Sequence, residues 1–79
     1  MNMIEALLAI QEDYVNLWAR PIRWKGHKQA VAYKPDSIHD SKCYNIVPSP
    51  GGRAVFILRP EDLTEAWETV NPTDVNNGN

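Results

Sequence analysis

The sequence predicts an α+β fold, in which one N-terminal amphipathic helix packs on a small antiparallel sheet of four to five strands. Three observations indicate this class. Apolar residues recur at helical spacing near the N-terminus, several short apolar segments follow, and Pro- or Gly-containing turns separate those segments. Consecutive strands joined by turns pair in antiparallel fashion, and a single helix can cover one face of the sheet that they form.

The helix is expected to begin after Asn2 and to end near Asn16. Asn2 and Glu5 have the spacing of a capping box, in which each side chain accepts a hydrogen bond from the other residue's backbone N–H. The apolar side of the helix is predicted to contain Ile4, Leu7, Leu8, Tyr14, Val15 and Trp18. The opposite, polar side is predicted to contain Glu5, Glu12, Asp13 and Asn16.

A hairpin is predicted after the helix. Pro21 ends helical character, so residues 20–24 are expected to form an extended edge segment, followed by a turn at 25–28 and a strand over 29–34. The polar stretch 35–42 is predicted to be a surface loop. A short strand over 43–47 is expected after that loop.

The segment 53–58 is predicted to be the central strand, because the residues on both of its faces are apolar. The turn at 49–52 leads into this strand, and Pro60 is expected to end it because proline donates no backbone hydrogen bond. One helical turn fits the corner that follows, where Asp62 is expected to accept hydrogen bonds from backbone amides. Four residues then return the chain to the core: Leu63, Ala66, Trp67 and Val70.

The 79 residues are predicted to form a single domain over residues 1–70, with a disordered tail over 71–79. A domain of this size buries only about 60 % of the surface of its unfolded chain. The lone Cys43 cannot form an internal disulfide, and no Cys/His cluster has the spacing of a zinc site. Self-association is therefore the expected source of additional stability.

Charge and hydropathy favour a cytoplasmic protein with a local anion site. No apolar run approaches the roughly 20 residues that cross a bilayer, and the N-terminus does not have the pattern of a signal peptide. The net charge is −2, but five Lys/Arg and no acid lie between Arg20 and Lys34. This distribution argues against binding of duplex nucleic acid. A solvated basic edge strand that discourages aggregation explains the charges equally well.

Five neighbouring residues combine the groups that bind nucleotides: Arg20, Arg23, Trp24, Lys25 and Gly26. Arginine pairs with phosphate through two parallel hydrogen bonds, an indole stacks on a base, and glycine allows a ligand to approach the backbone. An Arg–Trp contact or an oligomer contact is the structural alternative. Asp62 also has a structural and a functional interpretation. It either accepts hydrogen bonds from backbone amides at the predicted corner, or binds a base edge or a ribose hydroxyl of a ligand.

An enzyme is the class that the sequence supports least. His27 and His39 lie alone in predicted turns, and Cys43 lies within a predicted strand. Gly51 and Gly52 are not followed by the Lys and Ser/Thr of a phosphate-binding loop. No general acid and base come together, so we expect no catalytic residue, no metal and no cofactor.

The order of these motifs resembles the Thoeris anti-defence protein two family of small phage proteins. Members begin with a helix that contains Glu-Ala-Leu, here Glu5-Ala6-Leu7, and continue with an Arg to Trp-Gly segment, here residues 20–26. They end with a Pro, an Asp-Leu pair and a Trp-Glu-x-Val sequence, here residues 60–63 and 67–70. The resemblance extends over nearly all of residues 1–70. The chain departs from the family pattern at 14–18, where the usual glycine is missing, and between 63 and 67, which is one residue short.

The resemblance implies a homotetramer in the host cytoplasm that sequesters a cyclic nucleotide-type immune signal without cleaving it. Such a signal is glycocyclic ADP-ribose or a cyclic dinucleotide. Trp24 would then stack on a base, Arg20 and Arg23 would neutralise phosphates, and Asp62 and Tyr33 would supply a polar contact and a second ring. One alternative is an inhibitor of a host defence nuclease, of the anti-CRISPR type, which would act through the acidic side of the helix. A second is a phage structural or assembly protein without a ligand.

Overall fold

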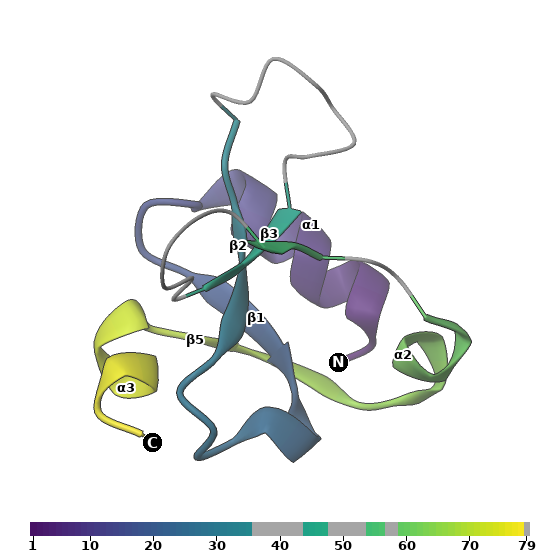
Figure 1. Ribbon diagram of the computed structural model, residues 1–79. Coiled ribbons are helices and arrows are strands. Elements are labelled where there is room, and N and C mark those ends of the chain that lie inside the picture. The colour runs from purple at the N-terminus through teal and green to yellow at the C-terminus, as the bar shows by residue number, and fades with distance from the viewer. Residues whose placement is uncertain (36–43, 48–53, 57–58, 79) are drawn as a thin grey trace.

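The computed structural model describes residues 1–35, 44–47, 54–56 and 59–78. The helices are α1 (Met3–Glu12), the 3₁₀ helix η1 (Ile22–Trp24), α2 (Pro60–Thr64) and α3 (Pro72–Asn76). The strands are β1 (Trp18–Pro21), β2 (Ala30–Tyr33), β3 (Tyr44–Val47), β4 (Ala54–Val55) and β5 (Trp67–Val70). They form one antiparallel sheet in the order β4-β3-β2-β1-β5, which confirms the predicted α+β class (Figure 1).

The N-terminus of α1 has the predicted capping box. Asn2 Oδ1 accepts a hydrogen bond from the Glu5 backbone N–H at 2.8 Å, and Glu5 Oε1 accepts one from the Asn2 backbone N–H at 2.9 Å. The helix ends at Glu12 with Asp13 as its C-cap, so it is shorter than the expected helix to Asn16. The local signal therefore predicted the start of the helix and not its end.

Of the residues predicted for the apolar side of α1, only Leu7 packs against the core within this helix. Met3, Ala6 and Ile10 are the buried residues of this helix, whereas Ile4 and Leu8 are 58 % and 54 % exposed. Positions 3, 6 and 10 follow the 3.6-residue period, and the partly buried Leu7 lies on the same side. The predicted set included Tyr14 and Val15, which lie beyond the end of the helix and are exposed.

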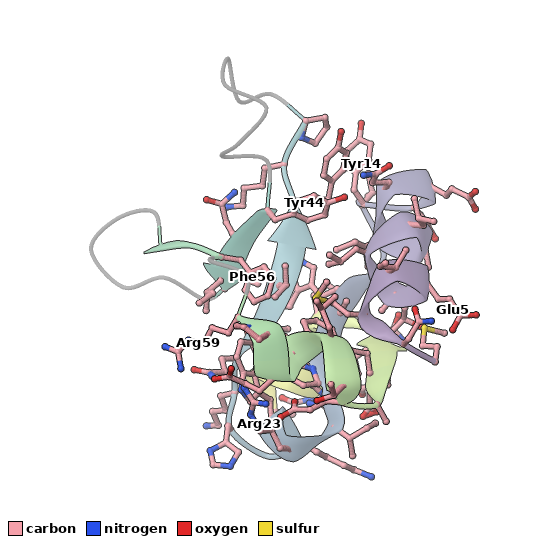
Figure 2. All side chains as sticks on the ribbon, turned by 90° about the vertical axis from the view of Figure 1, so that its right-hand side faces the viewer. Glu5, Tyr14, Arg23, Tyr44, Phe56 and Arg59 are labelled. Carbon is pink, nitrogen blue, oxygen red and sulfur yellow. The ribbon has the colours of Figure 1, made fainter. Side chains whose placement is uncertain are left out.

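The two faces of the sheet carry separate apolar clusters. The helix α1 covers one face of the sheet (Figure 2). On this face, Ala19, Val31 and Trp67 pack with the buried residues of the helix. The second cluster consists of Ala30, Ala32, Val47 and Val75, with Trp18 and Val70 packed against it. Trp67 is thus a core residue, as predicted, and Trp18 is a partly buried neighbour of the second cluster.

Residues 72–76 form the helix α3, where the sequence predicted a disordered tail over 71–79. Pro72 begins α3, at a position where its missing N–H removes no helical hydrogen bond. Val75 is fully buried against the second cluster. The prediction failed because the segment has only one large apolar residue, and the face that buries it is formed by distant parts of the chain.

We expect a Val75→Ala substitution to lower the free energy of unfolding by about 2 kcal/mol, because it removes two buried methyl groups and leaves a cavity. Urea unfolding followed by circular dichroism measures this change. Thr73→Ala is the matched control, since Thr73 is an exposed residue of the same helix. Equal stability of the two variants would contradict the docking of α3 on the sheet.

The strand positions differ from the predicted ones at both edges of the sheet. The hairpin of β1 and β2 is present, with Ala19 opposite Val31. However, β1 is an inner strand that pairs with both β2 and β5, and residues 22–24 form η1 instead of an extended edge. The strand predicted to be central contributes β4, which lies at the edge next to β3. β1 is an inner strand because β5 pairs with it over four residues, whereas β4 pairs with β3 at the opposite edge of the sheet.

Some predicted features lie outside the described residues. These are residues 36–42 of the predicted loop with His39, Cys43, the turn at 49–52, and Ile57 and Leu58. In the part of the chain that the structure describes, no helix combines the length and apolar character needed to span a bilayer.

Candidate functional site

A cavity of about 450 Å³ lies beside η1 and α2, and we refer to it as the η1–α2 pocket. Its volume falls within the range of small-molecule sites. Three of its lining residues were predicted as site residues, namely Arg23, Trp24 and Asp62. Four others were not predicted: Gln29, Ile46, Phe56 and Arg59. Arg23 and Arg59 lie on the side of the molecule that carries α2 (Figure 2).

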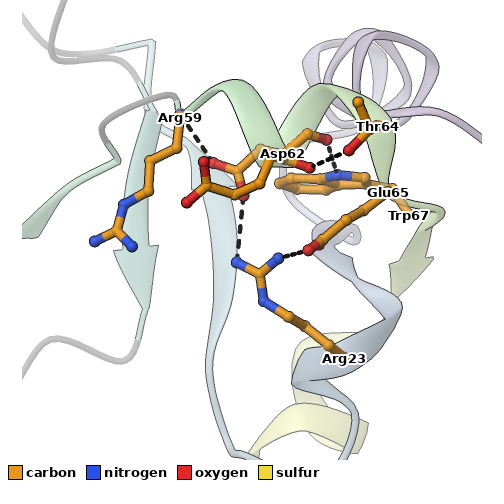
Figure 3. A network of polar contacts seen from close by, with 7 residues as sticks. Arg23, Arg59, Asp62, Thr64, Glu65 and Trp67 are labelled. Atoms are coloured by element: carbon orange, nitrogen blue, oxygen red, sulfur yellow. Dashed lines mark hydrogen bonds and ion pairs between the residues drawn. The ribbon is translucent and has the colours of Figure 1, made fainter.

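Asp62 is a buried carboxylate that connects α2 to η1. It is 2 % exposed, and its Oδ2 accepts a hydrogen bond from the Arg59 backbone N–H at 3.0 Å, which is the predicted capping role. Its Oδ1 lies 3.3 Å from Arg23 Nη2 (Figure 3). Asp62 therefore has both a structural contact with the start of α2 and an ionic contact in the pocket.

Arg23 is held between two carboxylates. In addition to its contact with Asp62, Nη1 of Arg23 forms an ion pair and hydrogen bond with Oε1 of Glu65 (Figure 3). Its Cζ lies 6.0 Å from the centroid of the Trp24 ring, which is within the range of a cation–π contact. The Arg23 guanidinium therefore has a fixed position, and carboxylates already compensate its charge.

Arg59 has a different environment. It immediately precedes α2, is exposed, and directs its guanidinium away from the network of Arg23, Asp62 and Glu65 (Figure 3). The ion pairs among the described residues do not include Arg59. Of the two arginines that line the pocket, Arg59 is the one whose charge no described carboxylate compensates.

Aromatic rings form part of the pocket wall. Trp24 and Phe56 are both half-buried and pack against the main core cluster. Phe56 contacts Trp67 edge-to-face, with ring centroids 5.9 Å apart, and its backbone N–H donates to the Tyr44 carbonyl at 2.9 Å. The core thus fixes the position of the Phe56 ring at the pocket.

The structure places the other predicted site residues away from this pocket. Arg20 is buried at 3 % exposure, pairs with Glu68 at 3.4 Å, and lines a separate cavity of about 410 Å³ together with Lys25. Gly26 has a positive φ of 87° in the turn after η1, a conformation that favours glycine. Tyr33 lies among tyrosines, with its ring centroid 6.1 Å from that of Tyr14 and 5.3 Å from that of Tyr44.

Sequence reasoning missed Arg59 because Pro60 was interpreted as the end of a strand, with one helical turn at the following corner, and not as the first residue of a helix. The sequence Arg-Pro-Glu-Asp does contain a usable signal, since proline is favoured at the first position of a helix. A helix that begins at Pro60 makes Arg59 the residue at its boundary, beside Asp62. Phe56 and Gln29 had no comparable signal, and the position of Phe56 at the pocket depends on the strand order.

The pocket combines an uncompensated guanidinium, a buried carboxylate and two aromatic rings, which are groups that bind a phosphate and a base. Among the residues that the structure describes, no three His, Cys, Asp or Glu side chains are grouped as a metal site requires. Comparisons of the chain with family models, with curated proteins and with solved structures found no match. A function is therefore inferred from the geometry of the pocket.

Proposed function

We propose that this protein binds and sequesters a cyclic nucleotide-type signal without cleaving it, as implied for the anti-defence family that its motifs resemble. The observation that carries this proposal is the η1–α2 pocket, where Trp24 and Phe56 lie with Arg59 and the buried Asp62. A phosphate, a base and a polar base edge would each find a matching group there. A protein of this kind acts through affinity and abundance alone, because it lowers the concentration of free signal.

Self-association as a homotetramer is part of the proposal. Several large apolar side chains are exposed, and Ile4, Leu8 and Val15 are 58 %, 54 % and 73 % exposed. Ile4 and Leu8 are one helical turn apart on α1, so their side chains lie on the same side of the helix. Exposed apolar patches of this kind are typical of protein contacts.

Thermal unfolding and titration calorimetry with cyclic dinucleotides and cyclic ADP-ribose isomers test the proposal. A bound ligand is expected to stabilise the protein by about 2.7 kcal/mol at a ligand concentration of 100 times Kd. The ligand should be recovered chemically intact, as measured by mass spectrometry after heat denaturation of the complex. A chemically altered ligand would indicate an enzyme, and the absence of binding across the panel would count against sequestration.

One observation favours the alternative, an inhibitor of a host defence nuclease. Glu5, Glu12 and Asp13 are exposed at α1 and its C-cap, where they could compete for a basic groove of a partner. Failure of the whole nucleotide panel would favour this alternative. Sequestration is the stronger proposal because the η1–α2 pocket has groups suited to a nucleotide, whereas the acidic surface is also explained by solvation.

A further inference from the structure

We infer that Arg59 is the phosphate-contacting residue of the η1–α2 pocket, and that the pocket selects singly charged phosphates over doubly charged ones. Phosphates within a nucleotide ring are diesters with one charge, whereas the terminal phosphate of a linear nucleotide is a monoester with a second charge. The inference rests on the proposed function, since it concerns how the same pocket distinguishes a cyclic nucleotide from a linear one.

The first step concerns the charge of Arg23. Its guanidinium contacts the carboxylates of both Asp62 and Glu65, whose side chains are 3 % and 27 % exposed. Two carboxylates more than compensate one guanidinium, so this group of three carries a net charge of −1. A phosphate that approached Arg23 would have to displace one of these carboxylates or remain beside it, and both cost free energy.

The second step concerns Arg59. Its guanidinium is exposed and pairs with no described carboxylate, so it can form the two parallel hydrogen bonds that arginine makes with phosphate. Its own backbone N–H is bound to Asp62 Oδ2 at 3.0 Å, which ties the base of the side chain to the buried carboxylate. Arg23 and Asp62 line the same cavity as Arg59, so an anion bound by Arg59 shares the pocket with a group that carries a net charge of −1.

The third step is the charge balance of the ligand. One diester charge is compensated by Arg59, but the second charge of a monoester, present at neutral pH, meets no further free cation in this network and is repelled by Asp62. We expect this repulsion between like charges in one pocket to weaken binding by roughly tenfold. The pocket is therefore expected to bind the closed ring in preference to its linear, terminally phosphorylated form.

This discrimination suits a sequestering protein. Linear nucleotides with terminal phosphates are abundant in every cell, and a pocket that accepted them would be occupied before the signal appeared. The charge of the terminal phosphate supplies this discrimination without a specific base contact.

The experiment compares three probes by calorimetry at neutral pH: cyclic di-AMP, the linear dinucleotide pApA, and pApA whose terminal phosphate is methylated. The unmodified protein is expected to bind cyclic di-AMP about tenfold more tightly than pApA. Methylation removes the second charge without closing the ring. Methylated pApA should therefore regain most of the affinity that pApA lacks relative to cyclic di-AMP. This probe separates the effect of charge from that of ring geometry.

Three variants test the role of Arg59. R59Q is expected to bind cyclic di-AMP about tenfold more weakly than the unmodified protein. R59K should lose less affinity than R59Q, because lysine keeps the positive charge but lacks the two parallel donors of arginine. K34Q is the matched control, since Lys34 is an exposed cation outside the pocket lining, and it should bind as the unmodified protein does. Melting temperatures of the free variants verify that each one is folded.

Equal binding of cyclic di-AMP and pApA, or unchanged binding by R59Q, would overturn the inference and leave sequestration standing. The inference would also be overturned, with sequestration still standing, if none of the three probes bound while a cyclic ADP-ribose isomer did. Failure of the entire nucleotide panel would overturn both the inference and the proposed function.

Discussion

Replacing Trp67 with alanine is expected to lower the free energy of unfolding by about 3–5 kcal/mol. Trp67 is 1 % exposed and contacts the buried residues of α1 from the first position of β5. Its indole Nε1 donates to the Asp62 backbone carbonyl at 3.0 Å, so the substitution also removes a buried hydrogen bond (Figure 3). A domain of this length has a total stability of only about 4–12 kcal/mol, so the loss is a large fraction of it.

Urea unfolding measures this effect, and two further variants separate its causes. Trp67→Phe retains a ring but loses the hydrogen bond to Asp62, and it is expected to cost about 1–3 kcal/mol. Trp24→Ala is the matched control, because Trp24 is a tryptophan that is only half-buried. If Trp67→Ala were no more destabilising than Trp24→Ala, Trp67 would not be the centre of the core.

Replacing Glu68 with alanine is the second substitution with a large expected effect, about 2–4 kcal/mol of stability. Glu68 Oε1 lies 3.4 Å from both Nε and Nη2 of Arg20, and Arg20 is 3 % exposed. The substitution removes the carboxylate partner that Glu68 provides to a buried guanidinium. We place the expected cost below that of a fully buried pair because the Glu68 side chain is 28 % exposed.

A double substitution distinguishes the net value of the ion pair from the cost of removing only one of its two charges. Arg20→Met with Glu68→Leu removes both charges, and it is expected to be less destabilising than Glu68→Ala alone. Glu61→Ala is the control, because Glu61 is an exposed carboxylate on α2. A Glu68→Ala cost as small as that of Glu61→Ala would show that Arg20 does not depend on Glu68.

The parts of the fold that the sequence predicted depend on residues close together in the chain. The capping box joins residues three positions apart, and Asp62 caps the backbone N–H of a residue three positions before it. The hairpin of β1 and β2 is likewise local. Such contacts need no knowledge of the remaining fold, because short segments can adopt them without outside partners.

The incorrect predictions concern burial and strand order, which are set by distant partners. Ala6 has little apolar surface, yet it is fully buried, whereas the larger Leu8 is exposed. Arg20 was predicted to bind the phosphate of a ligand. In the structure, strand β5 places Glu68, which is 48 positions later in the chain, beside Arg20. Arg59 became a candidate only when the fold placed it beside Arg23 and Phe56.

The pairing of β5 with β1 also sets an order for the folding reaction. The β1–β2 hairpin closes a short loop, whereas β5 meets β1 only after a loop of more than 40 residues has closed, which is entropically costly and slow. Asp62 and Arg23 are 39 positions apart, and they meet across this same long closure. An early intermediate with only the hairpin formed would therefore have no η1–α2 pocket, and ligand binding would report completion of the slowest step.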